Sequence, residues 1–228
     1  MPADTDETLT APEAEVERLP RGRHSLSREE VAERQRNRIL MGLVDTMAEK
    51  GFVPTTVADV IKAAGVSRET FYQLFTSKQD AFMAAFDAAA ELAVGTMGVD
   101  PAMPDTRSGE PNVAGSDHDI RLKVFAMALQ RYLTNLVENP ALARMFLIEV
   151  YAAGPEALER RLQFQGRLVD RMVGDLGLGE SNRFACELTV AATAAMVTPL
   201  LVAGDLGAIE SLGPRLVEAL DRLVVWPA

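Results

Sequence analysis

The segment that most constrains the fold of this chain is residues 55–78, TTVADVIKAAGVSRETFYQLFTSK, which has the signals of two short helices joined by a tight turn. Thr56 and Asp59 have the spacing of a capping box, in which each residue bonds the backbone amide of the other at the start of a helix. Gly65 can adopt the conformation that ends that helix, and Ser67 can cap the next one. Together these signals predict a helix-turn-helix, a structure that places its second helix on DNA.

The second helix of this pair has a buried face and a face suited to a partner. Phe71 and Phe75 lie four residues apart, so they share one face, which we expect to point inward. The residues on or near the outer surface are Arg68, Glu69, Thr70, Tyr72, Gln73 and Leu74. Ser77 and Asp80 then begin a third helix, and Lys78 lies in its first turn, where phosphate oxygens would meet a cation and free amides.

The charge of the chain is distributed unevenly along the sequence. A formal net charge of -10 by itself argues against binding to a polyanion. Residues 1–20 contain one basic and six acidic residues, residues 21–78 ten basic and seven acidic, and residues 79–228 twelve basic and twenty acidic. The positive charge therefore coincides with the helix-turn-helix, as expected for a DNA-reading domain on an acidic body.

The residues before the helix-turn-helix predict a first helix and a basic arm. Ser27 and Glu30 form a second capping box, and the apolar periodicity that follows predicts a helix to about Lys50 that packs on the helix-turn-helix. Arg21 and Arg23, separated by a glycine, suit a flexible arm that reaches into a minor groove. A solvated linker is an equal alternative for this arm.

The helix-turn-helix and its flanks resemble the DNA-binding domain of the TetR family of transcriptional regulators. The resemblance covers about residues 25–90, and several short motifs in combination make it specific. These motifs are Gly51-Phe52, Thr55-Thr56-Val57, Ala63-Ala64-Gly65-Val66-Ser67, Thr70-Phe71-Tyr72 and Phe75-x-x-Lys78. The family implies a dimeric, all-helical repressor that a ligand releases from DNA.

Carried over by position, the resemblance assigns tasks to individual residues. It implies base contacts from three of them: Arg68, Thr70 and Gln73. It implies phosphate contacts from three others: Thr56, Tyr72 and Lys78. Ser67 and the arm residues complete the expected DNA-binding set. Glu69 departs from the small residue often found at its position, and an acid there repels phosphate unless it accepts a bond from a cytosine amino group.

We expect an all-α chain in three parts. These are a disordered acidic tail at residues 1–20, a helix-turn-helix DNA-binding domain with its arm at 21–78, and a helical effector-binding and dimerisation domain at 79–228. No run after residue 78 alternates strictly enough to predict a strand. A connecting helix is predicted to about residue 95, followed by a mobile loop at 98–116. Further helices are predicted at 118–138, 140–152, 155–176, 180–203 and 206–225.

Two apolar stripes in the body are candidate walls of an effector site. The stripes, each at helical spacing, are Phe125, Leu129 and Tyr132, and Phe164, Leu168 and Met172. Helix packing alone requires the same pattern, so ordinary core is the competing interpretation. The resemblance implies that such helices surround a ligand cavity, which would suit a small apolar effector.

Two isolated residues of the body also need an interpretation. Glu149, inside the apolar run MFLIEVY, could meet a cationic or hydroxylated ligand, but exposure to solvent or pairing with a nearby arginine is the commoner outcome for an isolated acid. Cys186 is the only cysteine, so an intramolecular disulfide is excluded. A small core residue is favoured over a redox sensor, because no second cysteine is present to resolve an oxidised thiol.

The last two long predicted helices are candidates for a homodimer interface. Four alanines in the first of them would let backbones approach closely: Ala191, Ala192, Ala194 and Ala195. Four leucines line a second face: Leu212, Leu216, Leu220 and Leu223. Packing within one subunit is the alternative. A dimer is favoured because helix-turn-helix proteins generally use two reading heads, and the resemblance implies a four-helix contact from this region.

The sequence offers little support for an enzyme. His24 and His118 are the only histidines, neither has zinc-ligand spacing, and no nucleophile elbow or phosphate loop occurs. We therefore expect no catalytic residue, no metal and no cofactor. The acidic start of the chain lacks the features of a signal peptide, and no uncharged apolar run of about 18 residues or more occurs, so a soluble cytoplasmic protein is predicted.

The leading hypothesis is a homodimeric repressor that binds a palindromic double-stranded DNA operator and is released by a small apolar effector. An effector-independent DNA-binding protein is the alternative, and a helical enzyme is a third class. A body of about 150 residues is larger than DNA reading requires, which favours the ligand-responsive regulator.

Overall fold

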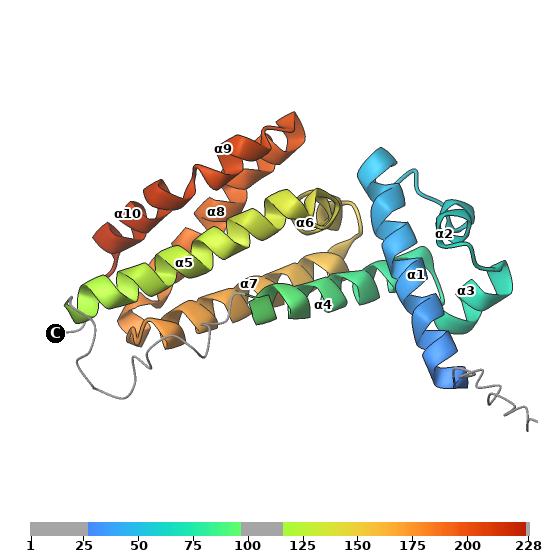
Figure 1. The fold of residues 1–228 in the computed structure, drawn as a ribbon, viewed down its shortest axis with the longest axis horizontal. Coiled ribbons are helices and arrows are strands. Elements are labelled where there is room, and N and C mark those ends of the chain that lie inside the picture. Colours follow the sequence, from blue (N-terminus) through green and yellow to red (C-terminus); the bar gives the residue numbers. More distant parts are fainter. Residues whose placement is uncertain (1–26, 97–115, 227–228) are drawn as a thin grey trace, which may run out of the picture.

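The structure, a computed structural model, describes residues 27–96 and 116–226, and every regular element in those two ranges is a helix. The elements are α1 (Arg28–Lys50), α2 (Val57–Ala64), α3 (Arg68–Leu74), α4 (Lys78–Thr96), α5 (Asp117–Glu138), α6 (Pro140–Leu147), the 3-10 turn η1 (Glu149–Tyr151), α7 (Pro155–Asp175), the 3-10 turn η2 (Glu180–Asn182), α8 (Arg183–Ala203), α9 (Leu206–Glu210) and α10 (Gly213–Leu223). Figure 1 shows α1, α2 and α3 gathered at one end of an elongated molecule, with the remaining helices packed into a body. The predicted all-α class is confirmed.

Some sequence predictions concern residues that the structure does not describe. The acidic tail at 1–20, the arm residues Arg21 and Arg23, and the predicted loop up to residue 115 lie outside the described residues. These predictions therefore stay predictions.

Helices α1, α2 and α3, which together with the loops between them we call the head, start and stop at the signals found in the sequence. Ser27 caps α1 through a reciprocal capping box with Glu30, and Thr56 caps α2 in the same way with Asp59. Gly65 ends α2 in the left-handed conformation, at φ 60°, and there its amide bonds back to the last turn of the helix. These caps satisfy backbone amides that a helix start leaves without partners, so the sequence defines the helix ends locally.

Close contact between α1 and α2 holds the head together. Gly42, buried on α1, lies so near α2 that an added Cβ would be 2.9 Å from the backbone nitrogen of Ala64. A side chain at this position would force the two helices apart, so Gly42 sets how closely they cross. Sequence reasoning did not identify this glycine.

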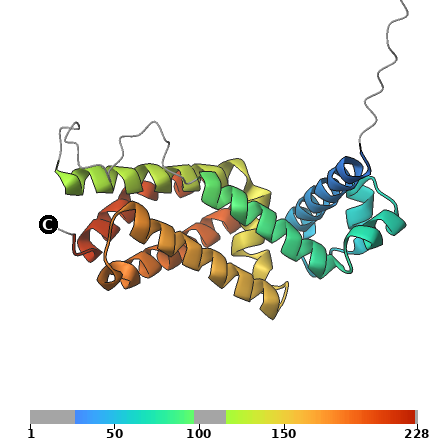
Figure 2. The same ribbon diagram turned by 90° about the horizontal axis from the view of Figure 1, so that it is seen from below.

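Helix α4 connects the head to the body. Its first turn lies against the head, and further along it packs on α7, to which it is joined by the ion pairs Arg160–Asp87 and Arg167–Glu91. Figure 2 shows α4 running from the three head helices into the body. The predicted domain boundary after residue 78 thus falls in the first turn of this shared helix.

Two predicted helices of the body are shorter than expected. The predicted helix at 140–152 ends at Leu147, because Ile148 leaves helical geometry, at φ -125° and ψ -62°, before a single 3-10 turn. The predicted helix at 206–225 is divided into α9 and α10 by a turn at residues 211–212. Pro214 lies in the first turn of α10, where a helix does not need the amide hydrogen that proline lacks. Further inside a continuous helix, the same proline would remove a backbone hydrogen bond, so its position favours a new helix start.

Helix α8 carries both buried and exposed apolar side chains. By length and composition alone, Glu180–Ala203 would be long and apolar enough to cross a membrane, and 39% of its apolar window is buried inside the molecule. A core helix of a soluble protein meets the same criterion. Its buried face packs on α7 and α10.

Candidate nucleic-acid interface and ligand cavity

Helix α3 presents the predicted reading surface. Phe71 and Phe75 are buried, with 0% and 2% of their surface exposed, so they fix the helix to the head core as predicted. Ser67 caps the helix by accepting a 3.0 Å bond from the amide of Thr70, and the two hydroxyls lie 2.9 Å apart. Burial of one face orients the other face outward.

The outward face of α3 is polar and internally connected. The guanidinium of Arg68 lies 5.4 Å from the ring centroid of Tyr72, whose side chain is 46% exposed. The amide of Gln73 donates a 3.3 Å bond to the carboxylate of Glu69. Glu69 therefore has a partner on its own helix, which orients Gln73, one of the predicted base-reading residues.

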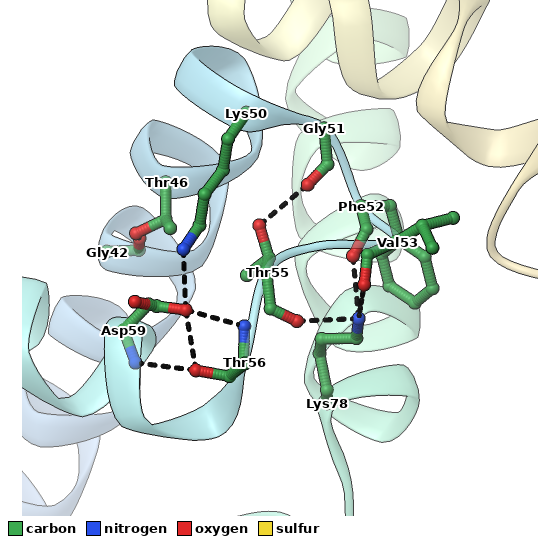
Figure 3. Close-up of polar contacts among 10 residues, drawn as sticks. All are labelled: Gly42, Thr46, Lys50, Gly51, Phe52, Val53, Thr55, Thr56, Asp59 and Lys78. Carbon is green, nitrogen blue, oxygen red and sulfur yellow. Dashed lines mark hydrogen bonds and ion pairs between the residues drawn. The ribbon is translucent and has the colours of Figure 1, made fainter.

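Thr56 lies at the start of α2, where its cap is part of a small charged network (Figure 3). Its hydroxyl donates a 2.5 Å bond to the carboxylate of Asp59, and that carboxylate also lies 2.6 Å from the ammonium of Lys50. The bonds from Lys50 and Thr56 hold the pKa of Asp59 well below its usual range. A phosphate contact from Thr56 would therefore involve an already ordered hydroxyl.

Lys78 has backbone partners within the head. Its ammonium donates to the carbonyl oxygens of Phe52, Val53 and Thr55 at 2.6, 3.3 and 2.7 Å (Figure 3). It also lies 4.0 Å from the ring centroid of Phe52. Burial and the charge of Lys50 lower the pKa of Lys78. Because an ammonium has three N–H donors, Lys78 clamps the loop between α1 and α2, and its predicted phosphate contact stays a prediction.

The described members of the predicted DNA-binding set all lie in the head or in the first turn of α4. Five of them belong to α3 and its cap: Ser67, Arg68, Thr70, Tyr72 and Gln73. Thr56 and Lys78 precede α2 and begin α4, respectively. Sequence reasoning did not include Arg38 of α1, whose guanidinium donates a 2.8 Å bond to the carbonyl of Gly65 and so supports the turn between the two helices.

Glu149 joins the body to the same loop of the head. Its carboxylate is buried, with 7% of the residue exposed, and accepts a 2.7 Å bond from the backbone amide of Phe52. The other carboxylate oxygen lies 3.7 Å from Arg144 of α6. Of the two outcomes expected for this acid, the structure shows the pairing with an arginine and not the exposure to solvent, because the turn after α6 points the side chain into the head.

An apolar pocket lies between α5, α7 and α8. It contains about 680 Å³ of space, its open mouth included. Five of the six predicted ligand-contact residues line it: Phe125, Leu129, Tyr132, Leu168 and Met172. Arg171 and Asp175 add a charged pair at 2.7 Å. An apolar lining with a few polar groups is typical of ligand pockets.

Phe164 does not line this pocket. It is buried in an aromatic cluster, with its ring centroid 5.1 Å from that of Phe146 and 6.2 Å from that of Phe86. The helical spacing of Phe164, Leu168 and Met172 correctly predicted one face of α7. That face is divided, however, between the pocket and the contact with α4.

Burial favours the neutral form of two ionisable side chains in the body, Tyr132 and Cys186. Burial raises the pKa of Tyr132 to about 12, so its hydroxyl stays neutral. Burial also raises the pKa of Cys186, which is fully buried as expected of a core residue. Across residues 27–96 and 116–226, no group of three His, Cys, Asp or Glu side chains could hold a metal ion.

A polar recognition helix held on a three-helix head, in front of a helical body with an apolar pocket, defines a helix-turn-helix transcriptional regulator. Residues 39–85 match the family model described as "Bacterial regulatory proteins, tetR family". This match shows that residues 39–85 form a DNA-binding domain of the TetR family.

Solved structures with the same fold cover most of the chain. The fatty acid degradation regulator FadR from Bacillus halodurans is 17% identical, with a TM-score of 0.64, over 81% of this chain and 97% of that one. FadR from Bacillus subtilis, solved in complex with stearoyl-CoA, is 18% identical, with a TM-score of 0.60, over 83% and 99%. A TetR transcriptional regulator from Rhodococcus sp. RHA1 is 22% identical, with a TM-score of 0.55, over 86% and 98%. No curated protein sequence matches the chain.

Proposed function

We propose that this TetR-family regulator is a homodimeric repressor that binds a palindromic operator and is released by a small apolar effector. In this proposal residues 21–78 read DNA, and residues 79–228 bind the effector and form the dimer. The observation that carries the proposal is the apolar pocket between α5, α7 and α8, whose walls include five residues predicted as ligand contacts.

DNA reading is assigned to the outward face of α3. Arg68, Thr70 and Gln73 would contact bases, because arginine and amide side chains match the donor and acceptor patterns of the major groove. Thr56, Tyr72 and Lys78 would contact phosphates and fix the position of the head. Cationic residues on α1 and α2 would add attraction that does not depend on sequence.

The dimer is assigned chiefly to the exposed face of α8. Its exposed residues include a series at helical spacing: Phe184, Leu188, Ala191, Ala195, Pro199 and Val202. This spacing is that of a helix face that packs against a second helix. Most of the leucine stripe instead packs within the subunit, since Leu212, Leu216 and Leu220 are buried, while Leu223 is 47% exposed.

Release by an effector requires that the pocket and the head be coupled. An effector shifts the population of DNA-binding molecules only if it binds the two conformations with different affinity. Two contacts are available for this coupling: the bond from Phe52 to Glu149 after α6, and the clamp from Lys78 at the start of α4. Movement of either helix would alter the loop that sets α2 against α1.

Operator selection followed by a binding assay tests the proposal. Genomic fragments retained by the full-length protein would be sequenced, and the recovered palindrome would be titrated with and without apolar compounds that raise the thermal unfolding temperature. We expect Arg68→Ala to cost about 1–3 kcal/mol at one operator base pair and to leave the others unchanged. A selective operator that no stabilising compound releases would favour the effector-independent alternative.

A further inference from the structure

Three neighbouring hollows in the body share the side chain of Tyr132. The first is the pocket between α5, α7 and α8. A smaller one, of about 290 Å³ with its open mouth and about 20 Å³ inside, shares Leu168 and Val190 with it. A third, which we call the α4–α6 hollow, contains about 730 Å³ with its mouth and shares Phe146 and Phe164 with the small one. Because adjacent hollows share wall residues, they form a row through the body, and Tyr132 is part of every wall.

The two ends of this row contact different helices. The first pocket is lined by residues of α5, α7 and α8 and by Leu176, the C-cap residue of α7. The α4–α6 hollow is lined by residues of α4, including Ala89 and Leu92, and of α6, including Leu142 and Phe146. Both α4 and α6 pack directly on α1 of the head. A molecule confined to the first pocket would touch neither of them.

Aromatic rings connect the wall of the α4–α6 hollow to the head. Phe164 of this wall lies 6.2 Å from Phe86 of α4, measured between ring centroids. Phe86 lies 6.4 Å from Phe82, and Phe82 lies 5.2 Å from Phe52 of the head loop. Displacing the wall would therefore disturb packed rings that extend to the residue held by Glu149 and Lys78.

The lining of the row suits a long apolar chain with few polar groups. The hydroxyls of Thr189 and Thr193 in the first pocket already donate to carbonyls of their own helix. Arg171 and Asp175 are paired with each other. At the opposite end, Asn135 and Asn139 offer amides at the α4–α6 hollow. A polar end group could therefore be met at either end of the row. In the middle, Arg161 and Gln165 line the small hollow but are bonded to each other at 3.1 Å, so the remaining apolar wall favours hydrocarbon there.

We infer that the effector is an elongated molecule with an unbranched apolar chain, which fills the first pocket and passes Tyr132 into the α4–α6 hollow. Its part in the α4–α6 hollow releases DNA, because only there does it contact both α4 and α6, the two body helices that pack on α1 of the head. This inference rests on the proposed release by an effector, and it adds the length of the molecule as the feature that separates effectors from inert ligands.

Saturated fatty acids of increasing length, used below their micelle concentrations, test the inference on the full-length protein. Octanoic, dodecanoic and hexadecanoic acids would be compared with naphthalene, a compact apolar probe. Binding would be measured by thermal shift and release by fluorescence anisotropy of labelled operator. We expect hexadecanoic acid to raise the operator Kd by about 10-fold or more, and the two shorter probes, octanoic acid and naphthalene, to leave it unchanged even when they bind.

Tryptophan substitutions that fill one end of the row or the other serve as matched controls for each other. Leu142→Trp would obstruct the α4–α6 hollow, so octanoic acid should bind as in the wild type while hexadecanoic acid no longer releases DNA. Met172→Trp would obstruct the first pocket and weaken binding of every acid. Leu92→Trp, at a side chain that is 68% exposed, obstructs the same hollow as Leu142→Trp with less risk to folding.

The outcomes separate this inference from the proposal on which it rests. If a compact ligand releases the operator as completely as hexadecanoic acid, or if both obstructing variants at the α4–α6 hollow release normally, the inference is wrong and effector release stands. If no apolar compound of either shape binds or releases DNA, effector release itself fails.

Discussion

At the scale of single residues, Lys78 has a structural role that its sequence motif did not indicate. Its position in the first turn of α4 predicted a phosphate contact, yet three carbonyls of the loop at residues 52–55 accept from its ammonium. The same side chain also lies over the ring of Phe52. Loss of Lys78 should therefore affect the stability of the head as well as its affinity for DNA.

Replacing Lys78 tests this double role. We expect Lys78→Ala to lower the free energy of unfolding by about 1–3 kcal/mol, because three carbonyls lose a charged donor. Chemical denaturation of the variant measures this loss, with Lys62→Ala, an exposed lysine of α2, as the control. Operator titrations at several salt concentrations measure the phosphate contact separately, since its loss reduces the salt slope by about one. An unchanged stability would contradict the clamp, and an unchanged slope would contradict the phosphate assignment.

The difference between local and distant bonds explains which residues the sequence could identify. The capping boxes of Ser27 with Glu30 and Thr56 with Asp59 join residues three positions apart, so spacing alone predicted them. Lys78 and Phe52 are 26 positions apart, and Glu149 and Phe52 are 97 apart. No pattern of neighbouring residues encodes such pairs, because they depend on how the helices pack.

At the scale of secondary-structure elements, η1 and the loop after α1 form the joint between body and head. Glu149 accepts from the amide of Phe52, and an added Cβ on Gly51 would lie 3.4 Å from the same carboxylate. The helix boundary that the sequence misplaced creates this joint, since a helix continued through residue 152 would point Glu149 elsewhere. The prediction of helix 140–152 followed apolar periodicity. The apolar pattern continues through Ile148, so it does not reveal that the backbone leaves helical geometry there.

Glu149→Ala tests whether this joint carries the effector response. We expect the variant to bind effector and operator, while the ratio of operator Kd values with and without effector falls by about 10-fold. Glu149→Gln, which keeps an oxygen acceptor for Phe52, should retain most of the response, and Glu138→Gln at an exposed position should retain all of it. Anisotropy titrations with and without effector give the ratio. A wild-type ratio in the alanine variant would exclude this joint as the route.

A second contact between elements joins the start of α5 to the end of the chain. The imidazole of His118 lies 2.7 Å from the carboxylate of Asp221 on α10, which also accepts a 3.0 Å bond from Trp226. The bond to Asp221 is the main reason that the pKa of His118 is raised, and Asp119 contributes. The contact is therefore strongest when the imidazole is protonated.

The raised pKa of His118 predicts a pH dependence of stability. Because the folded state binds this proton more tightly than the unfolded state, the stabilisation is fully present below the ordinary pKa of 6.5 and is lost as the pH rises through the raised value. Thermal unfolding from acid to mildly alkaline pH should show a steeper fall for the wild type than for His118→Gln. Equal pH profiles would contradict the assignment.

At the scale of the whole molecule, the predicted interface divides into a part that is buried within the subunit and a part that is exposed. The sequence placed the alanines of α8 and the leucines of α10 together in one interface. In the structure Leu212, Leu216 and Leu220 are buried inside the subunit, whereas Leu223 is exposed. The alanines divide as well: Ala191 and Ala195 are exposed, Ala192 is half-buried and Ala194 is buried. Periodicity identified both apolar faces but could not indicate which of them faces the subunit's own core.

Charge placed on the exposed face of α8 tests the dimer. Leu188 is 44% exposed, so Leu188→Glu should leave the fold intact and convert the dimer to a monomer, because a two-fold interface places the new charge on both faces. Light scattering coupled to gel filtration measures the mass. Leu162→Glu on α7, also an exposed apolar site at 65%, should remain dimeric. A dimeric Leu188→Glu protein with wild-type stability would locate the interface elsewhere.

The most direct measurement for the whole account is the operator Kd of the full-length protein in the presence of a compound shown to occupy both the first pocket and the α4–α6 hollow. The proposed function predicts that such a compound raises the Kd by about 5- to 150-fold. Because linkage is reciprocal, operator DNA should weaken binding of the compound by the same factor. A compound that binds the pocket tightly but leaves the operator Kd unchanged, at every chain length tested, would contradict the account.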